Sequence, residues 1–431
     1  MYAERIDLAK TVKHYGKVTQ VVGLVVESAG PAVSIGRLCR IENRDDGVKI
    51  RAEVVGFRDN KILLMPLGSM EGITPGAIVT STSEQLRIPV GRELIGRVLG
   101  GLGQPIDNKG PITSTVTRPV NGKPIPVLKR QRITQALRTG IKAIDIMTTV
   151  GQGQRMGVFA GSGVGKSILL GMMARGSSAD VNVIALVGER GREVREFIER
   201  DIGKEGLKRS VVVAVSSDQP ALIRIKGALV ASTIAEYFRE QGLNVMLMMD
   251  SVTRIAMAQR EIGLAVGEPP ATKGYTPSVF ALLPRLLERA GNTDQGAMTG
   301  FYTVLVEGDD LNEPISDAVR SILDGHVSLS RRLASLNQYP AVDFLDSISR
   351  LMPEVCTEEE IRLAAAVRQL VAIYRESEDL INIGAYVKGS NPKIDRAISK
   401  IDSINEFFRQ GIFERADHTA SLAALREIVE S

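Results

Sequence analysis

A run of small residues that ends in lysine and serine, Ala160-Gly-Ser-Gly-Val-Gly-Lys-Ser167, has the composition of a phosphate-binding loop. Its glycines permit backbone conformations that turn successive N–H groups toward a polyphosphate, and a helical pattern that follows adds its positive end. Lys166 would reach the β- and γ-phosphates, and the Ser167 hydroxyl would be a ligand of Mg²⁺. We therefore expect a nucleotide site whose loop contacts are Gly161, Ser162, Gly163, Val164, Gly165, Lys166, Ser167 and Ile168.

The strict form of this pattern begins with glycine, and Ala160 stands in that place. Alanine adds only one methyl group, so the departure is mild. An ordinary glycine-rich turn between a strand and a helix is the alternative interpretation. The lysine–serine pair and the flanking strand and helix patterns favour the nucleotide site.

Two carboxylates follow apolar runs of strand length. Residues 245–249 lead into Asp250, and residues 183–187 lead to Glu189. An aspartate at the carboxyl end of a parallel strand beside a phosphate loop holds Mg²⁺, usually through water, although capping of the next helix is the alternative. A carboxylate such as Glu189 can polarise the water that attacks a γ-phosphate, with Arg190 adding positive charge. On composition alone, a solvated run of charge is the better interpretation of residues 188–193.

The composition of the 431 residues is that of an ordinary globular protein, with 44% apolar and 24% charged residues. A net charge of +4, from 54 basic and 50 acidic residues, does not by itself imply nucleic acid or an anionic membrane. The two cysteines, Cys39 and Cys356, are far apart and are expected to be free thiols of a cytosolic protein. We find no signal peptide and no apolar run that could span a membrane, so only partners would hold the chain at one.

Four segments are expected along the chain. Residues 1–17 form a tail, and the short alternating runs of residues 18–81 predict a small closed β-barrel. Residues 82–350 combine a connector rich in glycine and proline with an α/β domain, because the uninterrupted apolar runs indicate parallel strands covered by helices on both faces. Residues 351–431 show helical periodicity and no clear strand, which predicts a helical domain. The runs expected as strands are 18–27, 32–41, 48–57, 61–66, 181–187, 210–215 and 245–249, and those expected as helices are 193–200, 221–239, 358–380 and 394–408.

Beyond the loop, four more motifs occur in order: Gly188-Glu-Arg190, Asp250-Ser-Val-Thr-Arg254, Tyr339-Pro-Ala-Val-Asp343 and Asp346-Ser-Ile-Ser-Arg350. Through these motifs, residues 18 to about 415 resemble the catalytic-subunit family of rotary ATPases and protein-export ATPases. The resemblance implies a P-loop, RecA-like core. It implies the following roles: Glu189 as the catalytic carboxylate, Arg190 and Arg254 near the γ-phosphate beside Lys166, Asp250 on the Mg²⁺ side, Tyr339 against the adenine with a further contact from Phe413, and Arg350 as the arginine finger that enters a neighbouring subunit's site.

Two features place the chain within that family. Non-catalytic synthase subunits have glutamine where Glu189 stands, so the resemblance implies a catalytic chain. The synthase divides the glutamate and the finger between two kinds of subunit, whereas this sequence has both Glu189 and Arg350, which implies a homohexamer. The wording of residues 154–167, 267–275 and 329–333 is similar to that of the flagellar type III export ATPases. A vacuolar-type catalytic subunit would need a large insertion after the barrel, for which the length leaves no room.

The resemblance implies Mg²⁺-dependent ATP hydrolysis by a homohexameric ring that energises flagellar protein export. The implied partners are a regulator or stator-like protein, a central-stalk protein, the export gate and chaperone–cargo complexes, at the cytoplasmic side of the inner membrane. The first alternative is an ATPase of a virulence injectisome. The second is an RNA-translocating ring, but the barrel offers only Phe57, with Tyr15 before it, to stack on bases, so no nucleic acid partner is expected. The third is a structural ring with a vestigial site, which the intact Lys166, Glu189 and Asp250 argue against.

Overall fold

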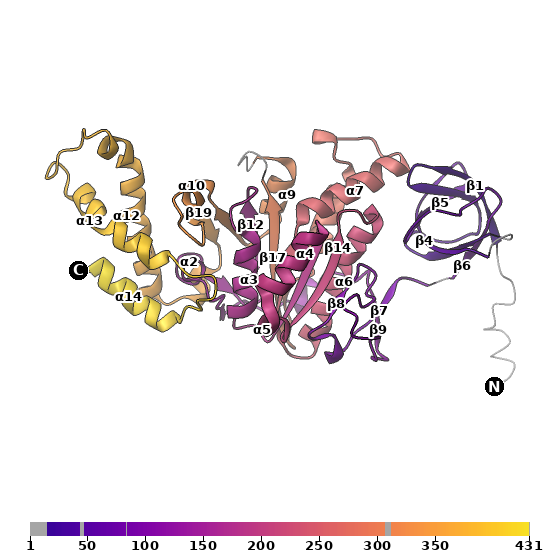
Figure 1. Ribbon diagram of the computed structural model, residues 1–431, viewed down its shortest axis with the longest axis horizontal. Coiled ribbons are helices and arrows are strands. Elements are labelled where there is room, and N and C mark those ends of the chain that lie inside the picture. Colours follow the sequence, from indigo (N-terminus) through magenta and orange to yellow (C-terminus); the bar gives the residue numbers. More distant parts are fainter. Residues whose placement is uncertain (1–14, 44–46, 83, 307–311, 431) are drawn as a thin grey trace.

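The computed structural model describes residues 15–43, 47–82, 84–306 and 312–430. Three parts follow one another along the long axis of the molecule: a small β-barrel, a central sheet with helices on both faces, and a group of C-terminal helices (Figure 1). This arrangement confirms the predicted fold class. The expected tail over residues 1–17 falls largely outside the described residues, and a strand already begins at Tyr15.

Six strands close the barrel in the order β1-β2-β5-β4-β3-β6. Side chains such as Val26, Ile41 and Val54 fill its interior, as expected for a barrel of this size. The β4–β5 hairpin turns through Asp59 and Asn60, whose positive φ angles of 48° and 61° suit a two-residue turn between twisted strands. The strands are β1 (Tyr15–Val22), β2 (Val25–Ala29), β3 (Leu38–Glu42), β4 (Lys49–Arg58), β5 (Lys61–Pro66) and β6 (Ile78–Ser81).

The central sheet has the strand order β19-β18-β12-β17-β15-β13-β14-β8. Its strands run parallel except β19, which is antiparallel to β18, and the short β16 (Gly291–Asn292), which pairs antiparallel with β17. The carboxyl ends of the parallel strands therefore meet at one edge, where ligands of open α/β sheets bind. The strands are β8 (Val98–Leu99), β12 (Arg155–Ala160), β13 (Val181–Glu189), β14 (Ser210–Ser216), β15 (Asn244–Asp250), β17 (Ala297–Leu305), β18 (Gly325–Leu329) and β19 (Val342–Ser349).

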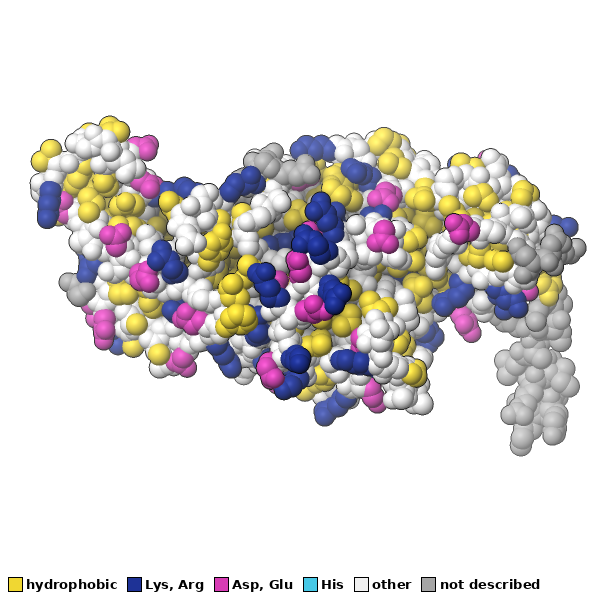
Figure 2. Space-filling view, in the orientation of Figure 1, with side chains coloured by type: hydrophobic (Ala, Val, Ile, Leu, Met, Phe, Trp, Pro, Cys, Tyr) yellow, Lys and Arg dark blue, Asp and Glu magenta, His cyan; other side chains and the backbone are white. Residues whose placement is uncertain are grey.

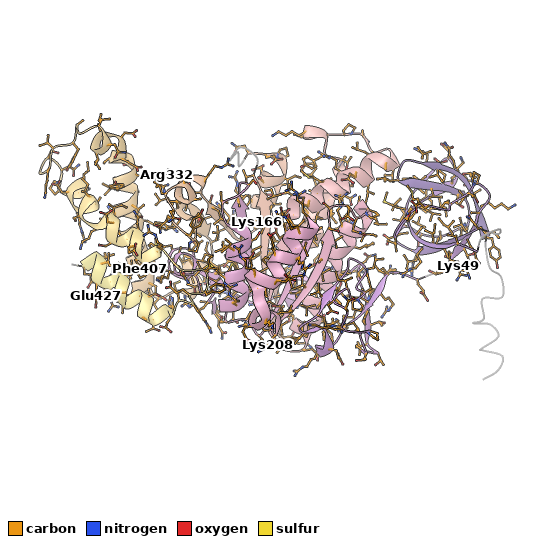
Figure 3. All side chains as sticks on the ribbon, in the orientation of Figure 1. Lys49, Lys166, Lys208, Arg332, Phe407 and Glu427 are labelled. Atoms are coloured by element: carbon orange, nitrogen blue, oxygen red, sulfur yellow. The ribbon has the colours of Figure 1, made fainter. Side chains whose placement is uncertain are left out.

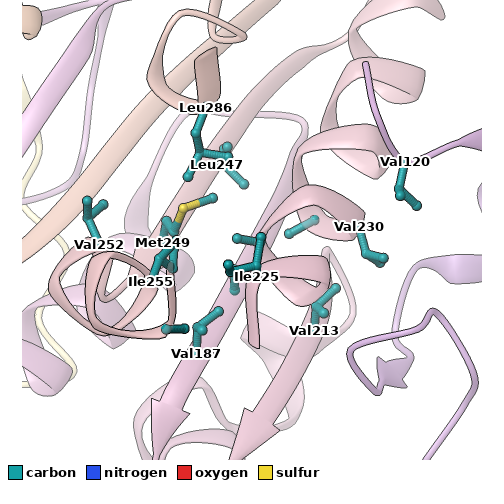
Figure 4. Close-up of a cluster of buried hydrophobic side chains, with 14 of the residues drawn as sticks. Val120, Val187, Val213, Ile225, Val230, Leu247, Met249, Val252, Ile255 and Leu286 are labelled. Atoms are coloured by element: carbon teal, nitrogen blue, oxygen red, sulfur yellow. The ribbon is translucent and has the colours of Figure 1, made fainter. Parts of the chain in front are cut away.

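Helices cover both faces of this sheet, which explains its uninterrupted apolar strands. On one face, Val187 of β13 and Leu247 of β15 pack among side chains of α6 (Ala221–Glu240) and α7 (Val252–Val266), as Figure 4 shows. On the other face, Ile184 of β13 belongs to the same cluster as Leu170 of α3 (Lys166–Gly176). The first face also carries α8 (Pro277–Leu287) and α9 (Pro314–Ile322).

The C-terminal part is helical, as predicted. Its long helix α12 begins at a capping box, in which the Thr357 hydroxyl accepts from the backbone N–H of Glu360 and the Glu360 side chain accepts from the backbone N–H of Thr357. Leu363 and Val367 of α12 and Ile404 of α13 are buried in the cluster that also covers the α3 face of the sheet. The helices are α11 (Met352–Val355), α12 (Glu358–Asn382), α13 (Pro392–Phe408) and α14 (His418–Glu430), of which α14 was not predicted.

Several local expectations were wrong. The run 18–27 forms two strands, because the chain turns at Gly23, where φ is 56°. Only the end of the run 32–41 is strand. The run expected as one helix over 193–200 is divided between α4 (Gly191–Glu196) and a π-helix over Phe197–Ile202, which α5 (Gly203–Leu207) follows. Nearer the start, the predicted connector contributes β8 to the sheet edge, because its backbone pairs with β14.

The remaining elements are short. The connector also contains β7 (Arg87–Pro89), β9 (Thr117–Pro119), β10 (Ala136–Leu137), α2 (Lys142–Met147) and β11 (Val150–Gly151), and α10 (Arg331–Ser335) follows β18. Turns of 3₁₀-helix lie at Arg92–Leu94, Val127–Lys129 and Thr272–Gly274. Across the described ranges, each helix is too short or too polar to cross a membrane.

A buried ion pair joins the barrel to the central domain. Lys226 of α6 and Glu53 of β4 are only 3% and 6% exposed. Lys226 Nζ donates to Glu53 Oε1 at 2.7 Å and lies 2.7 Å from Oε2. Burial raises the pKa of Glu53, and the nearby Lys226 opposes that rise. Each charge is therefore tolerated in this interface only because the other is present.

We expect Lys226→Met to destabilise the protein by about 3–5 kcal/mol, because it leaves the Glu53 carboxylate buried without its cation. The double variant Lys226→Met/Glu53→Leu should recover most of that loss, because an apolar pair replaces both charges. Urea unfolding followed by circular dichroism measures both. Lys208→Met is the control, since Lys208 pairs with Glu205 on the exposed surface. Equal effects of Lys226→Met and the control would contradict this account.

Candidate active site

The loop between β12 and α3 has the backbone geometry that its glycines predict. Gly163 and Gly165 have φ angles of 80° and 90°, in the left-handed region. Gly161 is not among the described residues with positive φ, so its glycine is not required for that reason. Gly165 caps α3, whose first residues are Lys166 and the exposed Ser167. The loop therefore presents a helix N-terminus and a free hydroxyl at the carboxyl edge of the sheet.

Lys166, labelled in the central domain in Figure 3, lies close to both predicted carboxylates. Its Nζ donates to Asp250 Oδ1 at 2.5 Å and lies 3.8 Å from Glu189 Oε1. The acids meet there because Asp250 ends β15 and Glu189 ends β13, strands that run parallel to β12. Thr303, on the intervening strand β17, donates to Asp250 Oδ1 at 2.7 Å. The structure thus brings the three residues together in the arrangement that phosphate and Mg²⁺ binding needs.

The surroundings of Glu189 raise its pKa above the usual range. Burial raises its pKa most, and the nearby Asp250 charge raises it further. Lys166 and Arg254 oppose this rise. Glu189 Oε1 is buried and has no hydrogen-bond partner among the described residues. A buried acceptor with a raised pKa, facing a phosphate loop, suits a group that accepts a hydrogen bond from a water molecule.

The oxygen donors at the loop fit a magnesium ion held mainly by substrate. The described residues contain no group of three or more histidine, cysteine or acidic side chains that could hold a metal. Mg²⁺ in such sites is bound by one or two protein oxygens together with waters and phosphates. Ser167, exposed beside the loop, and Asp250, at the adjacent strand end, provide that limited donor set.

Lys166, Ser167 and Glu189 line a cavity of about 780 Å³. Arg190 and Arg254 both line it, as the resemblance implied. Arg254 reaches it because its side chain packs on Gly188, where an added Cβ would lie 3.0 Å from the Arg254 Cβ. The Arg254 Nε is buried and has no hydrogen-bond partner among the described residues, whereas the exposed Arg190 side chain lies 3.5 Å from that of Glu193. Basic side chains are also frequent over the central domain on the face shown in Figure 2.

Four lining residues were not predicted: Glu193, Leu305, Val306 and Arg331. Val306 and Arg331 follow β17 and β18, so they lie at the same edge of the sheet as the loop. Arg331 falls within residues 329–333, which the sequence analysis used only as part of the resemblance to the flagellar export ATPases. Its place in the cavity was not predicted because Arg331 is far from the loop along the chain and the order of the strands cannot be read from the sequence.

A second, more apolar cavity of about 310 Å³ adjoins the loop. Tyr339 lines it and covers Gly165, where an added Cβ would meet the tyrosine ring at 3.5 Å. Ile168 and Met172 of α3 form another wall. Phe413 does not line this cavity: it is 77% exposed, and its ring lies 5.0 Å from the Arg175 guanidinium carbon. The geometry supports Tyr339 as a base contact, and the role of Phe413 stays a prediction.

Arg350 lies at the opposite edge of the sheet. It follows β19, which is antiparallel to β18, and the preceding Ser349 pairs with Gly325 at the start of β18. The loop, by contrast, follows the end of the six-residue strand β12. At about 3.3 Å per residue, a strand of that length separates the two sites by roughly 20 Å. The exposed Arg350 side chain is therefore too far from the nucleotide cavity of its own chain to contact a nucleotide there.

We expect Tyr339→Ala to weaken nucleotide binding by about 1–3 kcal/mol, the contribution of one base–aromatic stack. Phe413→Ala should leave the affinity nearly unchanged, because Phe413 packs on Arg175 outside the cavity. Titration with a fluorescent adenine nucleotide measures both dissociation constants. An equal loss in Phe413→Ala would mean that the segment after α13 closes over the base.

Three family models match the chain. The ATP synthase alpha/beta family, nucleotide-binding domain, matches residues 140–349, and the beta-barrel domain of the same family matches residues 18–83. The T3SS EscN ATPase C-terminal domain matches residues 356–427. Together these matches cover the barrel, the central sheet and the C-terminal helices.

Named relatives match over nearly the full length. The chain is 56% identical over 426 residues to the flagellum-specific ATP synthase of Bacillus subtilis (strain 168), which covers 98% of this chain and 97% of that protein. It is 48% identical over 418 residues to the type 3 secretion system ATPase of Xanthomonas euvesicatoria, which covers 97% and 95%.

A solved structure has the same fold. The assembled ATPase EscN of the enteropathogenic E. coli type III secretion system superposes with a TM-score of 0.91 at 43% identity, over 96% of this chain and 100% of that one. EscN in complex with its central stalk EscO gives a TM-score of 0.88 at 42% identity, with the same coverage. The chain belongs to the ATP synthase alpha/beta family, as an ATPase of the group that contains the flagellum-specific ATP synthases and the type 3 secretion system ATPases.

Proposed function

We propose that the chain is the ATP-hydrolysing subunit of a flagellar type III protein export apparatus and that it acts with Mg²⁺ as a homohexamer. The observation that carries the ATPase chemistry is the placement of Lys166 between Asp250 and Glu189 at the phosphate loop. The greater identity to a flagellum-specific relative than to a type 3 secretion system relative favours flagellar export over an injectisome.

The loop and Lys166 bind the triphosphate. The backbone N–H groups of the loop and the N-terminus of α3 surround the phosphates, and Lys166 exchanges its Asp250 partner for phosphate oxygens. The Ser167 hydroxyl and, through water, Asp250 would hold Mg²⁺, which would neutralise phosphate charge. The carboxylate of Asp250 stays oriented because Thr303 donates a hydrogen bond to it.

Glu189 positions the attacking water. Its unpartnered Oε1 accepts a hydrogen bond from that water, and its raised pKa makes it a better base than an exposed glutamate. Arg254 contributes positive charge where negative charge develops on the γ-phosphate, and Arg190 adds further positive charge from the rim of the cavity. These groups hold and polarise the reactants, which is the main contribution of protein side chains to phosphoryl transfer.

Arg350 completes the site of a neighbouring subunit. It lies at the edge of the sheet opposite the loop, so a head-to-tail contact between two copies can bring one loop beside one Arg350. Repetition of that contact closes a ring. An arginine supplied from a neighbour typically raises the hydrolysis rate by about 10³–10⁵.

The ring is expected to work with other proteins at the membrane. The solved relative EscN forms a complex with its central stalk EscO, which supports a central-stalk partner for this chain. The end of α12 and the turn that follows it expose Leu380, Ile383 and Val387, a surface suited to such a partner. We further propose a regulator or stator-like protein, the export gate and chaperone–cargo complexes as partners of a cytoplasmic ring recruited to the inner membrane.

A tagged chain, purified from its native host with its partners identified by mass spectrometry, tests this function. We expect flagellar regulator, stalk and gate proteins. Needle-complex proteins would contradict the flagellar assignment and move the ATPase to an injectisome.

Two inactive variants should distinguish water positioning from the arginine finger. Glu189→Gln should lower phosphate release at least about 10²-fold while ATP still binds, because the amide is a poor base in the same position. Arg350→Ala should also lose turnover with ATP binding retained. Glu196→Gln is the matched control, since Glu196 pairs with Arg192 on the exposed face of α4.

An equal mixture of Glu189→Gln and Arg350→Ala chains should regain up to about a quarter of the wild-type rate, because some interfaces then combine an intact Glu189 with a neighbour's intact Arg350. Phosphate release after co-assembly measures this. If the mixture stays inactive although mixed rings form, the site is not shared between subunits.

A further inference from the structure

The backbone of Arg350 is tied to the residue that precedes β18. The Arg350 N–H donates to the Asp324 carbonyl oxygen at 3.0 Å, beside the Gly325–Ser349 pair of the β18–β19 ladder. The two strands approach closely here, since a Cβ added at Gly325 would lie 2.4 Å from the Ile348 carbonyl oxygen. The position of the Arg350 Cα therefore depends on that of Asp324.

Asp324 is in turn clamped to Arg155, the first residue of β12. Its carboxylate accepts from the Arg155 backbone N–H at 3.1 Å and from Nε and Nη2 at 2.9 Å each. The Asp324 N–H donates to the Arg155 carbonyl oxygen at 2.9 Å. Four hydrogen bonds, two of them a bidentate pair with a guanidinium, define the geometry of one aspartate.

A buried glutamine joins the same group. Gln154 Nε2 donates to the Asp324 carbonyl oxygen at 3.2 Å and to Ser349 Oγ at 3.0 Å. Its Oε1 accepts from the Gly151 N–H at 2.7 Å, which holds the amide in this orientation. We call Gln154, Arg155, Asp324 and Ser349 the finger brace. Asp324 directly precedes β18 and Ser349 directly precedes Arg350, so the finger brace links the start of β18 to the end of β19.

The finger brace lies apart from the nucleotide cavities of its own chain, and none of its four members lines either of them. Among the described residues the exposed Arg350 guanidinium makes no hydrogen bond or ion pair, and it interacts electrostatically with His326 of β18, whose pKa it lowers. The direction in which the Arg350 side chain extends therefore depends mainly on the position of its backbone. A displacement of about 1 Å at a reacting group can cost about 10²-fold in rate, so the anchor of that backbone matters for turnover.

We infer that Asp324, through its clamp on Arg155, is a positioning residue that aims Arg350 into the site of the neighbouring subunit. This inference rests on the shared site of the proposed function. Asp324 thereby differs from residues that act on the nucleotide bound to their own chain. Its partner Arg155 nevertheless begins β12, the strand that leads into the phosphate loop.

Asp324→Asn keeps the side-chain volume and removes one of the two carboxylates that hold the Arg155 guanidinium, the other being that of Glu288. We expect its kcat to fall about tenfold or more, with the KM for ATP and the affinity for a fluorescent nucleotide within about twofold of wild type, since its own loop is intact. Asp317→Asn is the matched control, because Asp317 pairs with Arg320 on the exposed side of α9. An unchanged kcat in Asp324→Asn would overturn the inference.

Mixed assemblies identify the site on which Asp324 acts. Asp324→Asn mixed with Glu189→Gln should regain activity, because the Glu189→Gln chain supplies a well-aimed Arg350 to an intact loop. Asp324→Asn mixed with Arg350→Ala should regain nothing, because both chains then lack a working finger. The reverse pattern would overturn the inference and assign Asp324 to its own loop through β12.

A milder variant covers the case in which Asp324→Asn does not fold. Ser349→Ala removes one acceptor of Gln154 and leaves the Asp324–Arg155 pair in place. It should show a smaller loss of kcat and the same pattern in the mixtures, and recovery with Arg350→Ala would overturn the inference. If Glu189→Gln and Arg350→Ala do not complement each other, the shared site itself fails. If they do and Asp324→Asn follows the loop pattern, only this inference fails.

Discussion

The contact of Lys166 with the buried Asp250 and the partly buried Glu189 is the interaction on which the site depends. One cation holds Asp250 and Glu189 near each other, and phosphate oxygens can take the place of the acids when nucleotide binds. This arrangement requires three parallel strands that end at one edge of the sheet, with β17 between β12 and β15 to supply Thr303. The helices on both faces are needed because such strands are apolar throughout.

Strand β12 has functional groups at both of its ends. Its carboxyl end leads into the phosphate loop, and Arg155 at its amino end is bonded to Asp324 beside the arginine finger. The head-to-tail ring that we propose uses this polarity, because each subunit then offers a loop to one neighbour and Arg350 to the other. In that proposed ring, β12 connects the part of each chain that binds nucleotide with the part that faces the next subunit's site.

Sequence patterns predicted the elements that are locally encoded. The runs at 181–187, 210–215 and 245–249 form β13, β14 and β15, because continuous apolar residues of strand length suit only a sheet covered on both faces. The capping box at Thr357 begins α12 close to the predicted residue. The π-helix at Phe197–Ile202 was missed because its amphipathic pattern is that of an ordinary helix.

Sequence alone determined the chemistry of the loop, since Gly163, Gly165, Lys166 and Ser167 are neighbours along the chain and their local geometry follows from their residue types. Tertiary structure decided which distant groups join them. It brought Arg331 to the cavity, kept Phe413 outside the apolar cavity, and set Arg350 at the far edge of the sheet. The physical reason is strand order and direction: these are set by long-range pairing and packing, which no local pattern of residues records.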